Sequence, residues 1–224
     1  MAVRELELPG DLVRMGEIAA EIWSYPDHPE WSVQPDEEAS LGESMGNYQR
    51  IWPLVKLVQV FSPGLRDIVR GHVWEEDGQI VGLEQLSRRG TTDTWYVSAC
   101  GVLPRFRRRC IARKLDKAGA EFVRERGGKR LLLDVIEGNL PAIELYRKLG
   151  FSHYSSTMSL ELDPGVSFLS SPVLPSGYVT QSAGDFEWRP RFELMQRITP
   201  PDLCRYEPVE VGRYKRHVLA RVLL

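Results

Sequence analysis

The sequence predicts a mixed α/β fold in which a mostly antiparallel sheet is flanked by helices. Two observations predict this class. Residues 70–102 have the pattern of three strands, because residues 70–76 and 79–86 flank the hairpin turn Asp77-Gly78 and residues 94–102 follow a polar turn. From about residue 109 the pattern changes to helix, strand and helix, which is the order of a sheet with helices on its faces.

The remaining elements are predicted from periodicity and from capping residues. Residues 3–8 alternate apolar with charged residues as a half-buried strand does, and residues 12–22 have apolar residues at helical spacing. Loops are expected at 23–44 and a helix at 48–60. A helix is expected at 109–126, with a buried face of Ile111, Leu115, Ala118 and Phe122, and a strand at 130–135. A further helix should follow the N-cap candidate Asn139 and end at Gly150-Phe151, and a strand should follow at 153–162.

The chain is expected to contain one complete domain, residues 1–165, and a partial α/β segment, residues 166–224. Gly184-Asp185 matches Gly10-Asp11, and an apolar helical stripe follows each pair. The spacing predicts the opening strand and helix of a second copy of the domain, and the alternative is a chance match. The apolar run at 216–224 is expected to extend the sheet of the first domain or to pair with another chain, as in a homodimer.

Composition favours an ordinary globular protein without a general affinity for polyanions. The chain of 224 residues has 29 Lys and Arg against 31 Asp and Glu, a net charge of −2, so nucleic acid and membrane partners are not expected. Three cysteines without a C-x-x-C pair favour a reducing compartment, and no metal site is expected. The first residues lack an apolar signal core, so we expect a cytoplasmic protein.

A basic loop is the main functional feature of the sequence. Six of the ten residues from Arg105 to Lys114 are Lys or Arg, between a predicted strand and a predicted helix. Such a loop directs backbone N–H groups and a helix N-terminus at one place, which suits a phosphate group. A solvated basic surface is one alternative. A nucleic-acid site is another, but no aromatic residues of a stacking motif interleave with the arginines.

Two motifs in this region resemble a known family. Val102-x-Pro104-x-x-Arg107 is followed by Arg107-x-x-Cys110-x-Ala112, which is similar to the pyrophosphate loop Gln/Arg-x-x-Gly-x-Gly/Ala of the GNAT superfamily of acyl-CoA-dependent N-acyltransferases. Asn139-x-x-Ala142-x-x-Leu145-Tyr146-x-x-x-Gly150-Phe151 is similar to a later helix and strand of the same family. The resemblance covers residues 70–162.

The resemblance implies transfer of an acetyl or other acyl group from acetyl-CoA to a primary amine, by direct attack in a ternary complex. The acceptor amine would belong to a small molecule, a protein or peptide N-terminus, or a lysine. An alternative is a regulatory module that binds acyl-CoA without turnover. The residues implied in CoA binding are Gly101, Val102, Arg107, Arg108, Arg109, Cys110, Ile111, Ala112, Arg113, Asn139, Ala142 and Tyr146.

The resemblance also assigns chemical roles. Tyr146 occupies the position of the acid that protonates the departing thiolate, although it also suits a core aromatic residue. Glu84 is the candidate general base, because it faces the predicted cleft if residues 80, 82 and 84 share one face of their strand. Gly101 suits a β-bulge that leaves backbone groups free for pantetheine, or an ordinary strand end. Cys110 stands where the family loop has glycine, which puts turnover in question.

Residues 23–60 are expected to form the acceptor side. This span is rich in acidic and aromatic residues, which suit a cationic amine through charge and cation–π contact. A solvated charged face with a few core aromatic residues is the alternative interpretation.

Overall fold

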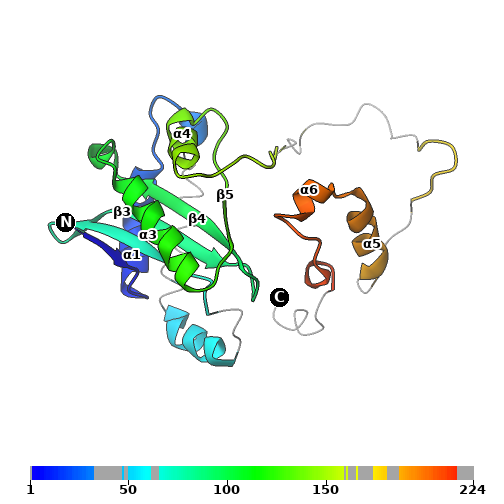
Figure 1. Cartoon of the computed structure of the whole chain (residues 1–224), viewed down its shortest axis with the longest axis horizontal. Coiled ribbons are helices and arrows are strands. Elements are labelled where there is room, and N and C mark those ends of the chain that lie inside the picture. Colours follow the sequence, from blue (N-terminus) through cyan, green and yellow to red (C-terminus); the bar gives the residue numbers. More distant parts are fainter. Residues whose placement is uncertain are drawn as a thin grey trace. The chain divides into compact units, whose positions relative to one another are not determined.

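The structure is a computed structural model that describes residues 2–32, 47, 50–61, 66–158, 160, 165, 174–180 and 187–215. The chain forms two compact units, Met1–Phe151 and Ser152–Leu224. The first unit contains the sheet and every residue of the predicted site that the structure describes (Figure 1).

The sheet has five strands in the order β1-β2-β3-β4-β5. Its members are β1 (Ala2–Glu5), β2 (Arg70–Glu76), β3 (Gln79–Arg88), β4 (Thr94–Val102) and β5 (Arg130–Leu133). The first four strands pair antiparallel, and β5 pairs parallel to β4. This arrangement confirms the predicted mixed, mostly antiparallel sheet. The β2–β3 turn is the predicted one, with Asp77 and Gly78 at φ of 53° and 76°, as a two-residue hairpin of type I′ requires.

Helices cover both faces of the sheet. A Cβ added at Gly82 would come within 3.0 Å of Ile111 and 3.3 Å of Leu115, so this face of β3 lies under α3 (Ile111–Glu125). A Cβ at Gly101 would overlap Ile22, the last residue of α1 (Gly10–Ile22), so the other face lies against α1. The predicted helices at 12–22 and 109–126 are thereby confirmed, and each has a sheet to cover.

The β-bulge lies at Ser98 and not at Gly101. Gln85 pairs with Ala99 and Leu86 pairs with Val97, which leaves Ser98 as the extra residue, whereas Gly101 is in regular register with Leu83. The expectation of a bulge at Gly101 is therefore wrong. The physical reason for glycine at this position is the close approach of α1, which leaves no room for a side chain.

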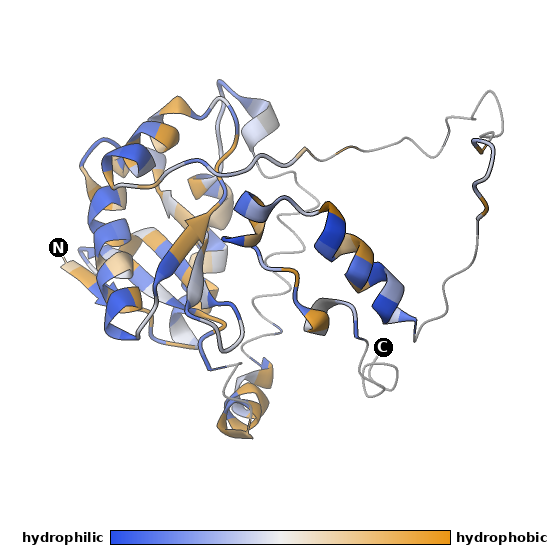
Figure 2. Ribbon diagram, turned by 45° about the vertical axis from the view of Figure 1, so that its right-hand side comes forward, coloured by the Kyte–Doolittle hydropathy of each residue, from blue (hydrophilic) through white to orange (hydrophobic). Residues whose placement is uncertain are grey.

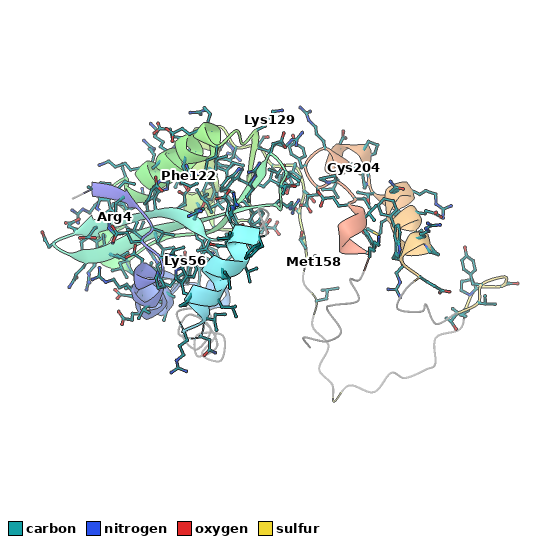
Figure 3. The ribbon with its side chains drawn as sticks, turned by 90° about the horizontal axis from the view of Figure 1, so that it is seen from below. Arg4, Lys56, Phe122, Lys129, Met158 and Cys204 are labelled. Carbon is teal, nitrogen blue, oxygen red and sulfur yellow. The ribbon has the colours of Figure 1, made fainter. Side chains whose placement is uncertain are left out.

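The core consists of two apolar clusters. The larger cluster joins α1, β2, β3 and α3, and the smaller one surrounds Trp95, which is fully buried and makes an edge contact with Phe122 at 5.8 Å between ring centroids. Figure 3 labels Phe122. The buried face of α3 differs from the predicted face: Ala118 is partly exposed, and Asp116 and Gly119 lie inside.

The helix α4 (Leu140–Lys148) follows β5 and has the predicted caps. The Asn139 side chain accepts a hydrogen bond from the Ala142 N–H at 3.3 Å. At the other end Gly150 has φ of 97°, and the N–H groups of Gly150 and Phe151 donate to the carbonyls of Arg147 and Tyr146. These bonds form a Schellman motif, in which Phe151 packs on Tyr146.

The strand predicted at 153–162 is not formed by residues 152–158, which have no regular secondary structure. The only large aromatic side chain among them, Tyr154, stacks on Tyr206 at 4.5 Å and donates a hydrogen bond to Glu207. Both partners belong to the second unit. Met158, at 82% exposure, packs on no sheet.

The second unit consists, where it is described, of α5 (Trp188–Ile198), α6 (Pro201–Cys204) and the short helix η4 (Val211–Arg213). The Phe192 ring contacts Trp188 and Tyr214 at 6.1 and 5.8 Å. Gly184-Asp185 and residues 216–224 lie outside the described residues, so the second repeat remains a prediction.

Residues 50–61 form a helix of the first unit with many apolar side chains (Figure 2). Trp52 is buried, whereas Phe61 is 78% exposed. In the parts of the chain that are described, no helix has the length and hydropathy needed to cross a membrane.

Candidate active site

The basic loop joins β4 to α3 and has an unusual backbone. A short helix, η3 (Pro104–Phe106), follows the end of β4. Arg108 and Cys110 then adopt φ of 64° and 62°, in the left-handed region. L-residues pay about 1–2 kcal/mol for this conformation and glycine does not. Cys110 stands where the family loop has glycine, so the backbone at this position retains the shape of a glycine-containing loop.

The N-terminus of α3 has no side-chain cap. The first bond of the helix runs from the Lys114 N–H to the Cys110 carbonyl at 3.2 Å, so the N–H groups of Ile111, Ala112 and Arg113 precede it. The side chain of the N-cap residue, Cys110, caps none of them. Amides that converge at a positive helix end are suited to a phosphate group.

Two of the four loop arginines predicted to bind CoA interact with other groups of the protein, and the other two form no ion pair with the described residues. The Arg107 guanidinium donates to the carbonyls of Val102 (3.2 Å) and Ile22 (2.8 Å), so it ties the end of β4 to α1. Arg109 forms an ion pair with Glu76 at 2.9 Å. Arg108 and Arg113 are exposed and form no ion pair with any described residue. Two of the four arginines predicted to bind CoA therefore already have intramolecular partners.

The edge of β4 beside the loop is not paired on the β5 side. The register between β4 and β5 ends at Val97↔Leu133, whereas β4 continues for five residues to Val102. The Tyr146 side chain comes from α4 to Cys100 in this unpaired part of β4. The end of β4, the loop and Tyr146 thus lie close together, beyond the point at which β5 ends. Asn139 and Ala142 are at the start of α4, where the Asn139 oxygen caps the helix.

Glu84 lies elsewhere than the sequence predicts. It does share the face of Gly82, but α3 covers that face, and Glu84 is fully buried. A Cβ on Gly119 of α3 would overlap the Glu84 carboxylate. Its Oε2 lies 3.4 Å from Nδ1 of His72, without the geometry of a hydrogen bond. Direct proton abstraction from a substrate by Glu84 has no open path in this arrangement.

Burial and mutual charge perturb the groups around Glu84. Burial raises the pKa of Glu84. Burial and the Glu84 charge raise the pKa of Asp116 to about 7. Burial, reinforced by the nearby carboxylates, raises the pKa of the Cys100 thiol well above its usual range, and burial with the neighbouring Cys100 raises the pKa of Tyr146. Such coupled groups in one place are typical of functional sites.

The sequence interpretation did not identify Asp116 and Cys100 as site residues. Asp116 precedes the buried Gly119 by three positions and the buried Val123 by seven, so a strict helical count places it on the inner face of α3. Cys100 is the register partner of Glu84, which becomes visible only once β3 and β4 are aligned. The signal that the sequence offered was a charged residue, Asp116, on the helix face that the apolar residues predict to be buried.

Three aromatic side chains lie together in the described part of the predicted acceptor side, residues 23–60. The His28 ring stacks on Trp31 at 3.7 Å, and Tyr25 makes an edge contact with Trp31 at 5.8 Å. A Cβ on Gly138, next to Asn139, would lie 3.4 Å from the Trp31 ring, so this cluster borders the start of α4. Residues 33–46, with most of the predicted acidic side chains, lie outside the described residues. Within the described chain, no three His, Cys, Asp or Glu side chains are grouped to hold a metal ion.

The unpaired end of β4 beside the uncapped N-terminus of α3 fits the α/β acyltransferase class that the motifs indicate. Residues 19–151 match the acetyltransferase (GNAT) family, and the chain belongs to this family. A streptothricin acetyltransferase of Streptomyces lavendulae is 36% identical over 76 residues, 34% of this chain and 40% of the relative. N-alpha-acetyltransferase 30 of Schizosaccharomyces pombe is 32% identical over 66 residues, 30% of this chain and 44% of the relative. The chain thus matches less than half the length of either relative.

Solved structures show the same fold. The PaiA N-acetyltransferase of Thermoplasma acidophilum, in complex with coenzyme A, aligns with a TM-score of 0.53 at 16% identity, over 70% of this chain and 94% of that one. An aminoglycoside acetyltransferase from an uncultured soil sample aligns with a TM-score of 0.50 at 20% identity, over 72% and 98% of the two chains.

Proposed function

We propose that this protein is an N-acetyltransferase that transfers an acetyl group from acetyl-CoA to a primary amine by direct attack in a ternary complex. The observation that carries the proposal is the convergence of the uncapped α3 N-terminus, the unpaired end of β4 and Tyr146 in one place. Membership of the GNAT family and the two curated acetyltransferases support it.

Each part of the convergence has a role toward acetyl-CoA. The amides of Ile111, Ala112 and Arg113 are suited to the pyrophosphate, and the side chains of Arg108 and Arg113 are suited to the outer phosphate. The unpaired edge of β4 from Ser98 to Val102 offers backbone groups to the amides of pantetheine, as an added strand would use them. The thioester then reaches the neighbourhood of Tyr146.

The chemistry follows from the charges that change during transfer. An amine is mostly protonated at neutral pH and loses a proton before it attacks. A backbone N–H near Val102 stabilises the oxyanion of the tetrahedral intermediate. Tyr146 donates its proton to the sulfur as the CoA thiolate departs. Glu84 is too deeply buried to contact the amine, so water is the first acceptor of the amine proton.

The acceptor is proposed to be cationic and to bind beside the His28–Trp31 stack. Aromatic faces attract an ammonium group within about 6 Å. The related proteins named above act on a small molecule, streptothricin, or on protein N-termini, and both acceptor classes contain primary amines.

The proposal is tested with the full chain in two assays. Calorimetry with CoA should show binding that weakens in the double variant Arg108→Ala/Arg113→Ala, with Arg124→Ala as a matched control on the far end of α3. Thiol release from acetyl-CoA, measured over a panel of aminoglycosides, polyamines and N-terminal peptides, should show turnover that Tyr146→Phe reduces by about 10² or more, the range of one general acid. Binding without turnover across the panel would favour the non-catalytic module, and absence of CoA binding would refute both functions.

A further inference from the structure

A carboxylate lies at the end of β5, where the pairing of β4 with β5 stops. Asp134 directly follows Leu133, which is the last residue of β5 and the last to pair with β4. The Asp134 side chain accepts a hydrogen bond from the hydroxyl group of Tyr96 on β4. Asp134 is exposed and forms no ion pair with any described residue. A neutral hydroxyl group therefore holds the carboxylate in place and leaves its charge to attract a cation.

Tyr96 and Asp134 lie on the face of the sheet that α3 does not cover. Val97 of β4 and Leu133 of β5 pack in the apolar cluster that contains Phe122 of α3. Tyr96 precedes Val97 and Asp134 follows Leu133, so alternation along the strands directs both side chains to the opposite face. The hydrogen bond between the two side chains agrees with this placement.

This face of the sheet is covered at Gly101 and exposed at the β-bulge. An added Cβ at Gly101 would overlap Ile22, so α1 lies against the sheet there. Three positions earlier, the bulged residue Ser98 is exposed, as Asp134 is. The Ser98 hydroxyl oxygen lies 2.9 Å from that of Ser87 on β3. A polar, solvent-exposed surface therefore occupies this face beside the bulge.

The proposed path of pantetheine leads to this surface. The unpaired edge of β4 runs from Val102, next to the basic loop, back to Ser98. An arm that follows this edge from the pyrophosphate carries its thioester toward Ser98. On the β5 side, the first residue beyond the paired segment is Asp134. The thioester and the Asp134 carboxylate are thereby brought to the same end of the unpaired edge.

The aromatic cluster of the acceptor side borders the same place. Tyr25 of this cluster follows Ile22, the last residue of α1, by three positions, and α1 covers the face on which Asp134 lies. A Cβ on Gly138, four residues after Asp134, would lie 3.4 Å from the Trp31 ring. The short segment 134–138 therefore joins the carboxylate to the cluster. A cationic amine between them would be stabilised by charge on one side and by cation–π contact on the other.

We propose that Asp134 is a catalytic residue that contacts the acceptor nitrogen, and that Tyr96 is a positioning residue that fixes the Asp134 carboxylate. This inference rests on the proposed acetyltransferase function and adds to it the group that serves the amine. The nitrogen is positively charged twice, first as the arriving ammonium group and again after it has attacked the thioester. A carboxylate that is already fixed in place stabilises the second charge without reorganisation at the moment of reaction.

The proton transfers balance with Asp134 as the second acceptor. Water takes one proton from the ammonium group, and the free amine forms a C–N bond to the thioester carbon. The nitrogen is then positive, and its N–H bond breaks as an O–H bond forms on Asp134. The C–S bond breaks as Tyr146 gives its proton to the sulfur. Asp134 passes its proton to water and Tyr146 regains one from water, so each turnover releases one proton.

A matched pair of CoA thioethers tests the contact without turnover. S-(2-aminoethyl)-CoA carries an ammonium group just beyond the sulfur, and S-propyl-CoA has the same number of heavy atoms without the charge. In calorimetry with the full chain, the parent should bind the aminoethyl compound about fivefold more tightly, which is the effect of an ion pair at an exposed position. Asp134→Asn should bind both compounds equally, whereas Glu121→Gln, at an exposed carboxyl of α3, should retain the preference.

The thioether pair also separates the two proposals. Equal affinities of the parent for the two compounds would overturn the role of Asp134 and leave the acetyltransferase function standing. Absence of binding for both compounds would refute CoA as the cosubstrate, and both proposals would then fail.

Kinetics tests the proton transfer. With acetyl-CoA and the fastest amine of the panel, Asp134→Asn should lower kcat by about 10² or more, the range of one general base, with unchanged KM for acetyl-CoA. Formate should restore part of kcat in Asp134→Ala, because it supplies a carboxylate in the vacated space, and should have no effect on the parent. An undiminished kcat in Asp134→Asn would overturn the catalytic role even if the thioether preference is present. If no amine is turned over, the acetyltransferase function and the proton transfer both fail, and the thioethers still decide whether Asp134 contacts a cation there.

Tyr96→Phe tests the positioning role, because it removes the hydroxyl group and keeps the ring. The variant should lose part of the preference for S-(2-aminoethyl)-CoA while its affinity for S-propyl-CoA stays that of the parent. Added to Asp134→Asn, it should cause no further loss of kcat, since the group that it positions is already absent. Weaker binding of S-propyl-CoA, or an additive loss of kcat in the double variant, would show that Tyr96 does not act through Asp134.

Discussion

The buried Asp116 carboxyl should make the stability of the first unit depend on pH, and Asp116→Asn should remove that dependence. Folding raises the pKa of Asp116 from 3.8 to about 7. Between these values the unfolded chain is ionised while the folded chain still holds the proton, so the unfolding free energy falls as pH rises. Above pH 7 both states are ionised, and this contribution becomes constant.

The size of the effect follows from the two pKa values. Each unit of difference corresponds to about 1.4 kcal/mol, so the unfolding free energy should fall by about 2.5 kcal/mol between pH 5 and pH 8. Burial of Glu84 raises its pKa and acts in the same direction. Burial opposes the ionisation of Asp11, but hydrogen bonds from Arg4 and from the Glu7 N–H outweigh it and lower the pKa of Asp11, so this residue titrates below the chosen range. Asparagine has the shape of the acid but cannot ionise. The unfolding free energy of Asp116→Asn should therefore exceed that of the parent by a margin that grows toward pH 8.

Urea unfolding followed by tryptophan fluorescence measures this difference. Five of the six tryptophans belong to the first unit, and Trp188→Phe restricts the signal to them. Glu121→Gln, at an exposed carboxyl of the same helix, is the matched control and should follow the parent at every pH. Parallel curves for Asp116→Asn and the parent would refute the reasoning, because they would mean that Asp116 is ionised in the folded protein as easily as in the unfolded chain.

Two further predictions concern the backbone of the site. Cys110→Gly should raise the unfolding free energy by about 1 kcal/mol, because glycine adopts the φ of 62° without strain. The control Cys110→Ala should give no such gain. Equal midpoints of urea unfolding for the two variants would contradict this prediction. Gly101→Ala should lower the unfolding free energy by about 1–3 kcal/mol, because the new Cβ overlaps Ile22. Ile22→Ala should then lower the unfolding free energy less in the Gly101→Ala background than in the parent. Purely additive effects in thermal denaturation would show that the two residues are not in contact.

Local sequence signals predicted the features whose hydrogen bonds join residues close together in the sequence. The Asp77-Gly78 turn and both caps of α4 depend on bonds within a few positions, so residue type and spacing sufficed. The strand at 153–162 failed for the opposite reason. A strand needs a partner, and the side chain of Tyr154 pairs with Tyr206, 52 positions away, in place of a sheet.

The sequence by itself determined the family and the places of the basic loop and of Tyr146 in the chain, because these depend on motifs of closely spaced residues. Tertiary structure decided the use of the individual side chains. Arg107 is turned to the carbonyls of Val102 and Ile22, Gly101 makes room for α1, and Glu84 is buried under α3 instead of facing a cleft. Strand alternation gives the face on which a residue lies but not what covers that face. The partners of Glu84, namely Asp116 and Cys100, come from a helix and a strand that only the folded chain brings together.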